Sequence, residues 1–272
     1  MTKLLVYGGG GWLGQWCKSR LERRFGEVRY SDARVHAGEM PEIPEDITHV
    51  LTFIGRTRGP GCNTIDYLER KGMLPINIRD NIVAPILISE ACKNAGVHCT
   101  YLGTGCLFQD DRKYTDKDEP NYAGSAYCAA KGATDSLMRA LYSDTTLNVR
   151  FRMPIVDEDG PYDFITKICT YKRIINEPNS VSVMPSLIGP LMDHMLMKTT
   201  GPLHLVNANP LSHGQIMELY KEVVDPEKTW TFFTTEEQNA MLSAPRSNVI
   251  LEPMEGAEDT ETAIRKVLAL RK

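Results

Sequence analysis

Four side chains between residues 103 and 131 are of the types that move protons at a carbonyl group. Tyr127 and Lys131 are four residues apart, so on a helix they would share one face. A cation beside a phenol favours the phenolate, and we therefore expect the pKa of Tyr127 to be lowered. Thr104 supplies a second hydroxyl group, and Cys106 supplies a thiol two residues further on. This set predicts acid–base chemistry next to a carbonyl carbon.

A glycine-rich turn follows the first predicted strand and opens the first predicted helix. Gly8, Gly11 and Gly14 are spaced three apart, and Trp12 and Leu13 complete the turn. Such a turn lets the backbone approach a pyrophosphate, because the helix N-terminus offers N–H groups and the positive end of its dipole. A strand, a glycine turn and a helix in this order predict a dinucleotide site formed by these residues.

The end of the second predicted strand is where the adenosine ribose of a dinucleotide is recognised. Asp32 at this point would favour a free 2′-hydroxyl group, whereas Ser31 and Arg34 would favour a 2′-phosphate. We weigh Arg34 with Ser31 above Asp32, and we therefore expect NADPH as the cofactor, with NADH as the alternative. A third predicted strand ends at Gly55, where a cofactor would lie in an open α/β sheet.

Strands and helices alternate over the first part of the chain, which predicts an α/β fold with a Rossmann-type, doubly wound parallel sheet. We expect strands over residues 3–7, 27–31, 49–54, 97–103 and 147–153, and helices over residues 12–24, 76–95 and 123–142. A polar segment, residues 109–122, predicts a loop over the site.

The pattern changes after residue 153 and indicates a smaller mixed C-terminal lobe. We expect an NADP-binding domain over residues 1–153 and a substrate-binding lobe over residues 154–272, with the chain interleaving between them. Substrate would bind between the two parts. In the lobe we expect helices over 163–173, 182–198 and 213–224, the last capped by Ser212, and a strand over 203–206.

The composition excludes several classes of protein. The 272 residues include 31 Lys and Arg against 35 Asp and Glu, a net charge of −4, which argues against nucleic acid or a membrane surface as partner. Seven scattered cysteines and six separated histidines show no disulfide framework and no metal-ligand spacing. No secretory signal and no bilayer-spanning run are recognised. We therefore expect a cytoplasmic protein without a metal.

The glycine turn, Thr104 and the Tyr127-x-x-x-Lys131 pair resemble the extended short-chain dehydrogenase/reductases. Other segments are similar to the dTDP-4-dehydrorhamnose reductase branch: Gly103-Thr-Gly-Cys-Leu-Phe and Asp118-Glu-Pro. Downstream segments resemble the plant-type nucleotide-rhamnose synthase/epimerase-reductase, and they extend the resemblance over nearly the whole chain: Arg150-Phe-Arg-Met-Pro-Ile, Asp163-Phe-Ile-Thr-Lys-Ile, Ile175-Asn-Glu-Pro-Asn-Ser and Ala244-Pro-Arg-Ser-Asn.

The resemblance implies a bifunctional 3,5-epimerase/4-reductase that converts UDP- or dTDP-4-keto-6-deoxy-D-glucose to the L-rhamnose nucleotide with NADPH. It gives Thr104, Tyr127 and Lys131 the reduction at C4, where Tyr127 supplies the proton and Lys131 also holds the nicotinamide ribose. Cys106 and Lys167 match the residues that epimerise C3 and C5. Which of these two is the acid and which the base stays open, as does the choice between UDP and dTDP.

Two substrate contacts and the assembly complete these expectations. Asn81, within the helix expected over residues 76–95, is assigned to substrate binding. Arg246 is assigned to the nucleotide diphosphate, with a structural ion pair as the alternative. By resemblance, the partner is a nucleotide-linked 4-keto-6-deoxy sugar and the chain forms a homodimer.

Two other functions stay open. A monofunctional dTDP-4-dehydrorhamnose 4-reductase would not need Cys106 or Lys167. A non-catalytic, NADP-binding regulatory subunit would not need an intact pair of Tyr127 and Lys131.

Overall fold

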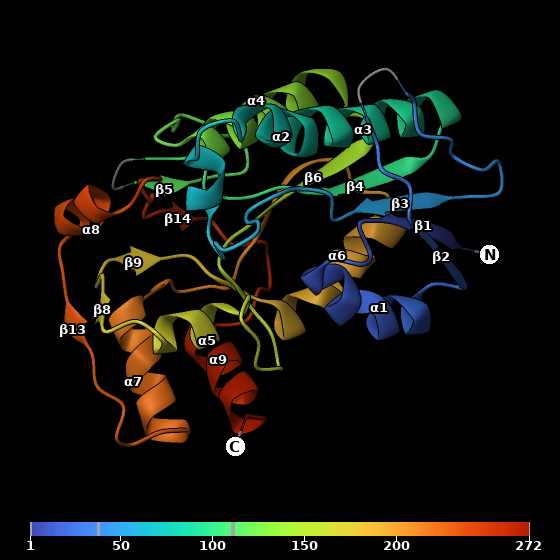
Figure 1. Ribbon diagram of the computed structural model, residues 1–272. Helices are drawn as coiled ribbons and strands as arrows, with labels where there is room; N and C mark the ends of the chain where they lie inside the picture. The colour runs from blue at the N-terminus through green and yellow to red at the C-terminus, as the bar shows by residue number, and fades with distance from the viewer. Residues whose placement is uncertain (1, 37–38, 110–111, 272) are drawn as a thin grey trace.

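The centre of the molecule is a six-stranded parallel sheet (Figure 1). The computed structural model describes residues 2–36, 39–109 and 112–271. The strands lie in the order β11-β6-β4-β3-β1-β2, which confirms the predicted doubly wound, Rossmann-type sheet. Their bounds are β1 Lys3–Tyr7, β2 Glu27–Ser31, β3 His49–Thr52, β4 His98–Leu102, β6 Thr146–Phe151 and β11 Gly201–Leu205.

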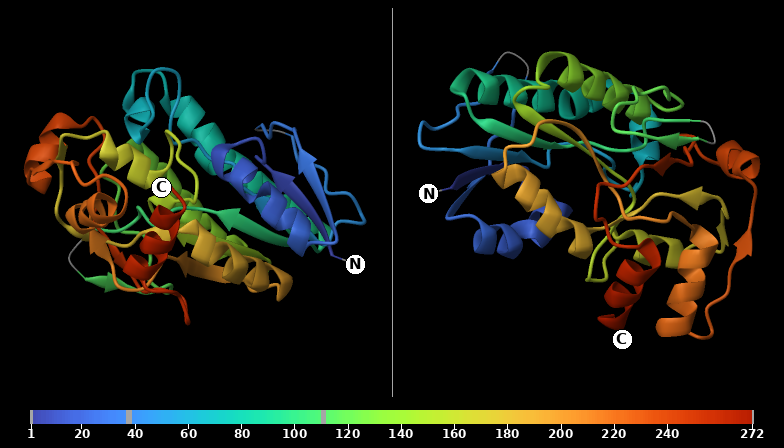
Figure 2. Two further views of the ribbon diagram at one scale, coloured as in Figure 1. Left: turned by 90° about the horizontal axis from the view of Figure 1, so that it is seen from below. Right: turned by 180° about the vertical axis from the view of Figure 1, so that it is seen from behind.

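Helices cover both faces of this sheet (Figures 1 and 2). Because both faces are covered, β3 and β4 are buried along their whole length and show no polar–apolar alternation. One face carries α1 (Trp12–Arg24) and α6 (Met184–Leu196), and the other carries α2 (Leu74–Ile78), α3 (Ala84–Ala95) and α4 (Ala126–Leu141).

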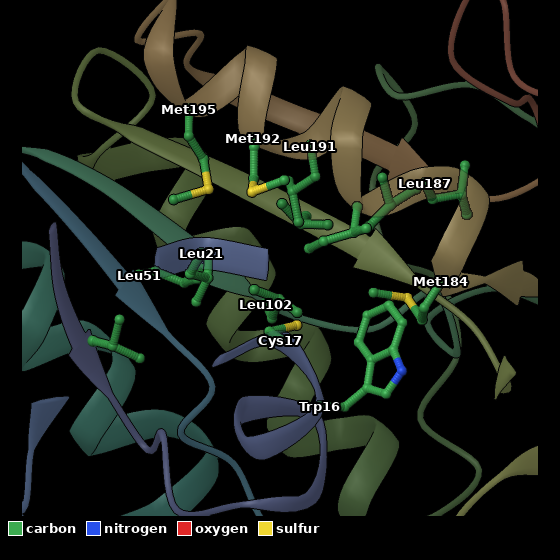
Figure 3. Packing of buried hydrophobic residues seen from close by; sticks show 14 of the residues in the cluster. Trp16, Cys17, Leu21, Leu51, Leu102, Met184, Leu187, Leu191, Met192 and Met195 are labelled. Carbon is green, nitrogen blue, oxygen red and sulfur yellow. The ribbon is translucent and has the colours of Figure 1, made fainter. Parts of the chain in front are cut away.

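The largest apolar core lies between the sheet and the pair α1 and α6 (Figure 3). Trp16 and Leu21 of α1 lie in one cluster with Leu187 and Met195 of α6, and the sheet contributes residues such as Leu51. Four of these five side chains are fully or almost fully excluded from solvent, and Trp16 is 5 % exposed. This core fixes α1, and with it the glycine turn at its N-terminus, against the sheet.

The sheet reverses its winding beside β1. This strand pairs with β2 on one side and with β3 on the other, and Tyr7 lies opposite both Ser31 and Thr52. The three strands therefore end level with one another. In an open α/β sheet, ligands bind in the crevice outside the carboxyl ends at such a reversal point.

A smaller lobe packs beside the carboxyl edge of the sheet. It has its own apolar core, in which Ile165, Ile216 and Ile264 of three helices meet. The helices are α5 (Phe164–Cys169), α7 (His213–Val223) and α9 (Thr260–Ala269), with α8 (Thr235–Met241) at the edge. Two-stranded sheets join its segments: β7 (Pro154–Ile155) with β10 (Ser182–Val183), β8 (Arg173–Ile174) with β13 (Thr231–Phe232), β9 (Pro178–Asn179) with β12 (Leu211–Ser212), and β5 (Lys113–Tyr114) with β14 (Ile250–Leu251).

The chain passes between the two parts more than once. It enters the lobe at β7, returns to the sheet through α6 and β11, and enters the lobe again before α7. The strand expected over residues 203–206 is thus the last strand of the central sheet, at 201–205. Among the described residues, no helix is both long and apolar enough to cross a membrane.

Several helix bounds differ from the expected ones because of local capping. Helix α4 begins at Ala126 rather than at residue 123, since the Ser125 hydroxyl accepts a hydrogen bond from the Cys128 N–H at 3.1 Å. The helix expected over residues 163–173 ends at Cys169, and the last expected residue, Arg173, begins β8 instead. The Ser212 cap of α7 is confirmed, and Gln215 completes a capping box.

The helix expected over residues 76–95 is a helical run from Leu74 to Ala95 with a π-helical turn, Arg79–Val83, inside it. It ends at Gly96, whose φ of 66° is the left-handed conformation that glycine adopts at helix ends. A π turn widens the helix by one residue, and such turns are frequent at functional sites.

A buried ion pair joins α4 to β6. The Arg150 guanidinium donates to both carboxylate oxygens of Asp135, at 2.8 and 2.6 Å, and the two side chains are 0 % and 3 % exposed. Asn148 donates to the same carboxylate at 2.7 Å. Arg150 also donates to the backbone carbonyls of Asp116 and Asp118, so the pair fixes the acidic loop as well.

We expect Asp135→Asn to lower the free energy of unfolding by about 3–5 kcal/mol, because it leaves the buried Arg150 charge without its partner. Urea unfolding followed by circular dichroism measures this change. Glu222→Gln is the matched control, since it removes the carboxylate of the exposed pair between Glu222 and Arg265. A loss no larger than that of the control would contradict the importance given to the buried pair.

Candidate active site

A cavity of about 1050 Å³ lies between the carboxyl edge of the sheet and the smaller lobe. The turns after β1, β3, β4 and β6 form one side of it, and α5 and the segment before β14 form the other. Most of the predicted site residues line this cavity: Gly11, Trp12, Leu13, Gly14, Gly55, Thr104, Cys106, Tyr127, Lys131, Lys167 and Arg246. Gly8, Ser31, Arg34 and Asn81 lie outside its wall.

The glycine turn leaves the N-terminus of α1 open. Gly8 has a φ of 72°, and a Cβ at Gly14 would lie 2.6 Å from the Gly9 carbonyl oxygen, so both positions require glycine. Gly11 caps the helix without a side-chain hydrogen bond, and the first turn carries no acidic residue. The first N–H groups of α1 are thus available to an anion such as a pyrophosphate.

Ser31 is the last residue of β2, and Arg34 lies in the loop that follows. β2 pairs with β1, the strand that leads into the glycine turn. The Ser31 hydroxyl accepts a hydrogen bond from the Ala33 N–H at 3.2 Å, which turns the chain after the strand. Arg34 is exposed in the loop that follows. This placement fits the recognition of an adenosine ribose, which occurs next to the glycine turn in dinucleotide-binding folds.

Tyr127 lies on the buried face of α4, next to Thr104 and Cys106. Burial raises the pKa of Tyr127, the Cys106 thiol acts in the same direction, and a hydrogen bond with the Thr104 side chain acts in the opposite one. The expected lowering of this pKa by Lys131 is therefore wrong for the unliganded chain. The physical reason is that the helix face shared by the two residues is buried, and burial disfavours the phenolate.

Lys131 forms its hydrogen bond with a different tyrosine, Tyr101. Its ammonium group donates to the Tyr101 hydroxyl at 2.7 Å, and burial lowers the pKa of Lys131 to about 7. Gly55 lies against the same nitrogen, where a Cβ would be 2.9 Å from it. The glycine after β3 is needed for this close approach, a role that the sequence did not reveal.

Asn81 lies behind the site rather than in it. It is fully buried in the π turn, and its side-chain amide donates to the Arg56 carbonyl and accepts from the Arg56 N–H, both at 2.9 Å. A third hydrogen bond joins it to Asn77 at 2.8 Å. With these bonds the amide positions the loop after β3. The geometry does not provide the expected contact of Asn81 with substrate.

Cys106 follows β4 and faces an arginine that sequence reasoning missed. Its backbone N–H donates to the Thr104 hydroxyl at 3.2 Å, and its sulfur accepts from the Arg152 guanidinium at 3.4 Å. Arg152 lies two residues after Arg150, just past the end of β6. The contact joins segments 46 residues apart, and the sequence carried no signal that would place Arg152 near the thiol.

Lys167 reaches the cavity from the smaller lobe. Asp163 caps its helix, α5, by accepting from the Thr166 N–H at 2.9 Å, and the lysine ammonium donates to the Asn63 carbonyl at 3.3 Å. Burial lowers the pKa of Lys167, and the nearby charges of Arg58 and Arg246 add to that effect. A lysine of this kind gives up its proton more readily than a surface lysine.

Arg246 lines the cavity and takes part in an ion pair. Its guanidinium donates to the Asp66 carboxylate and to the Ala244 carbonyl, so the structural ion pair considered as an alternative is present. Arg58, further along the wall, stacks on Tyr162 with 3.1 Å between the guanidinium carbon and the ring centroid. Asp66 also lines the cavity and balances the charge of Arg246, whereas Arg58 forms no ion pair with a described carboxylate and adds a positive charge to the wall.

The polar segment over residues 109–122 does not cover the cavity. Among its described residues, which exclude 110 and 111, none contributes to the wall. Arg139 and Arg150 hold this loop through its backbone carbonyls, and β5 within it pairs with β14. In the described part of the chain, no group of three or more His, Cys, Asp or Glu side chains could hold a metal ion.

Similar proteins include a viral enzyme and a plant enzyme. The L780 UDP-rhamnose synthase of Acanthamoeba polyphaga mimivirus is 38% identical over 99% of both chains, and its crystal structure matches with a TM-score of 0.90 at 35% identity over 98% of this chain and 99% of that one. A bifunctional dTDP-4-dehydrorhamnose 3,5-epimerase/reductase of Arabidopsis thaliana is 30% identical over 90% of this chain and 83% of its own length.

A bacterial reductase shares the fold. The crystal structure of dTDP-4-dehydrorhamnose reductase from Bacillus anthracis in complex with NADP has a TM-score of 0.77 at 14% identity and covers 98% of each chain. No protein-family model matches the chain. With the Tyr127 and Lys131 pair, the glycine turn and two relatives at 30% identity or more, the chain belongs to the family of rhamnose-nucleotide epimerase/reductases within the short-chain dehydrogenase/reductase fold.

Proposed function

We propose that the chain is a bifunctional 3,5-epimerase/4-reductase that converts UDP- or dTDP-linked 4-keto-6-deoxy-D-glucose to the L-rhamnose nucleotide with NADPH. The observation that carries the proposal is that one cavity holds both sets of residues. Thr104, Tyr127 and Lys131 line it together with Cys106 and Lys167. A reductase alone has no need of the last two.

The cofactor site is formed by the chain's own backbone and a few side chains. The glycine turn and the N-terminus of α1 would hold the pyrophosphate, and Ser31 with Arg34 would hold the 2′-phosphate of NADPH. Lys131, whose ammonium group lies next to Gly55, would hold the nicotinamide ribose. When bound, NADPH supplies the hydride for C4.

In the reduction, Tyr127 and Thr104 bind the C4 oxygen of the sugar. Tyr127 gives its proton to this oxygen as the C4 carbon is reduced, and the raised pKa keeps the phenol protonated until then. Lys131, with a pKa near 7, can pass a proton toward the phenol afterwards.

Epimerisation uses the same two hydroxyl groups. The protons on C3 and C5 are acidic because both carbons flank the C4 carbonyl, and the negative charge of the enolate gathers on the oxygen that Tyr127 and Thr104 bind. Cys106 on the sheet side and Lys167 on the lobe side remove and return the protons. Inversion requires an acid and a base from different directions, which these two elements offer.

The first test is proton exchange in deuterated water without NADPH. We expect the purified chain to incorporate deuterium at C3 and C5 of the 4-keto-6-deoxyglucose nucleotide, as measured by mass spectrometry and NMR. Cys106→Ala should slow this exchange by about 10²–10⁴-fold, the usual contribution of an acid–base group. Cys62→Ala is the matched control, because Cys62 is also half-buried but lies outside the cavity wall.

Exchange that is absent in the unaltered chain would contradict the epimerase half of the proposal. Continued reduction of a pre-epimerised 4-keto-L-rhamnose nucleotide would then assign the chain as a monofunctional 4-reductase.

Reduction is tested separately with Tyr127→Phe. We expect kcat for the pre-epimerised ketone to fall by about 10²–10⁴-fold, because the proton donor at C4 is lost. NADPH binding, measured by fluorescence titration, should change little. Unchanged turnover would show that this site does not carry out the reaction, as expected for a regulatory subunit.

Cofactor choice is tested with Arg34→Ala. We expect the KM for NADPH to rise about tenfold or more, since a hydrogen bond from arginine to the 2′-phosphate is charge-assisted. The KM for NADH, which lacks this phosphate, should stay the same. Equal effects on the two cofactors would argue against a role of Arg34 in recognising the phosphate.

A further inference from the structure

Arg152 is a buried cation with no carboxylate partner among the described residues. It is 2 % exposed, and none of the described acidic residues forms an ion pair with it. The two other arginines whose side chains are this deeply buried are both paired: Arg150 with Asp135, and Arg271 with Asp163. Leaving a buried charge without a counter-charge costs several kcal/mol in general, so Arg152 calls for an anion.

The contacts of Arg152 identify that anion. Its guanidinium donates to the Gly105 carbonyl at 3.2 Å, the Ser247 carbonyl at 2.9 Å and the Asn179 amide oxygen at 2.8 Å. These three acceptors are neutral. The fourth is the Cys106 sulfur at 3.4 Å, and it is the acceptor in the set that can carry a full negative charge.

The other titratable groups that face the thiol carry no charge that could take the place of the Arg152 charge. Tyr127 and Cys128 face it from α4, and Tyr122 approaches from the loop before that helix. All three are neutral, since burial raises the pKa of each. The charge of Arg152 also acts on His213, which lines the same cavity. Burial lowers the pKa of His213, and the charge of Arg152 lowers it further.

We propose that Arg152 holds Cys106 as a thiolate, and that Cys106 is therefore the base and Lys167 the acid of the epimerisation. This assignment rests on the proposed function of the same site. Arg152 is a positioning residue, because it acts on the sugar through the sulfur.

The proton balance follows from this assignment. The Cys106 thiolate takes the proton from C3 or C5, and the electron pair of the broken C–H bond moves to the C4 oxygen bound by Tyr127 and Thr104. The Lys167 ammonium then gives a proton to the same carbon from the lobe side as the carbonyl re-forms. The products are a thiol and a neutral amine, and exchange with water restores both. The lowered pKa of Lys167 suits a group that must give up its proton.

The test measures the thiolate directly and needs no substrate. Each variant is alkylated with iodoacetamide over a range of pH, and peptide mass spectrometry follows the rate at Cys106 alone. We expect Arg152→Gln to slow alkylation at pH 7 by about tenfold or more, since tenfold corresponds to a change of one unit in the thiol's ionisation. Arg152→Lys keeps the charge and should restore most of the rate. Arg58→Gln, which removes another cavity cation, is the control and should leave the rate unchanged.

The outcomes separate this inference from the proposed function. Equal alkylation rates in Arg152→Gln and the unaltered chain, with both folded by circular dichroism, would overturn the role of Arg152 even if epimerisation is observed. An alkylation loss restored by lysine supports it even if deuterium exchange is absent. If Arg152→Gln does not fold, Arg152→Lys and the unaltered chain still decide. The reference is Cys169, which is also half-buried and whose pKa is raised by burial to about 11; a rate at Cys106 no faster than at Cys169 in both would contradict the thiolate.

Discussion

The buried ion pair of Arg150 and Asp135 sets the position of α4, the helix that carries Tyr127 and Lys131, relative to β6. Asp135 lies one helical turn after Lys131 on α4, and Arg150 of β6 lies two residues before Arg152, which follows the end of that strand. Because both charges are buried and hydrogen-bonded, α4 cannot slide along β6 without separating them. The pair therefore fixes the distance between the phenol on the helix and the guanidinium beside the thiol.

In the proposed mechanism, Tyr127 and Thr104 bind the carbonyl oxygen in both reactions, because three different parts of the chain meet around them. The helix α4 brings Tyr127, the turn after β4 brings Thr104 and Cys106, and the lobe brings Lys167. Ketone and enolate carry their oxygen in nearly the same place, so the same hydroxyl groups stabilise both. The difference between a reductase and an epimerase in such a site is then a matter of two added side chains.

The sequence was sufficient for the features that depend on local pattern. Strand and helix periodicity, the glycine turn and the four-residue spacing of Tyr127 and Lys131 each reflect short-range geometry, and the sheet and most cavity residues followed from them. Burial and long-range pairing could not be predicted in the same way. The direction of the Tyr127 pKa, the backbone bonds of Asn81 and the contact of Arg152 with Cys106 depend on segments that are 25 to 46 residues apart or on how deeply they pack.

The late return of the chain to the sheet affects how the protein must fold during synthesis. Until β11, residues 201–205, has left the ribosome, β6 is an edge strand with open backbone hydrogen-bonding groups. The same strand bears the Arg150 charge, whose environment in the finished molecule includes His204 of β11. An unpaired edge of this kind is a template for pairing with other chains, so the addition of β11 is the step that closes this side of the sheet.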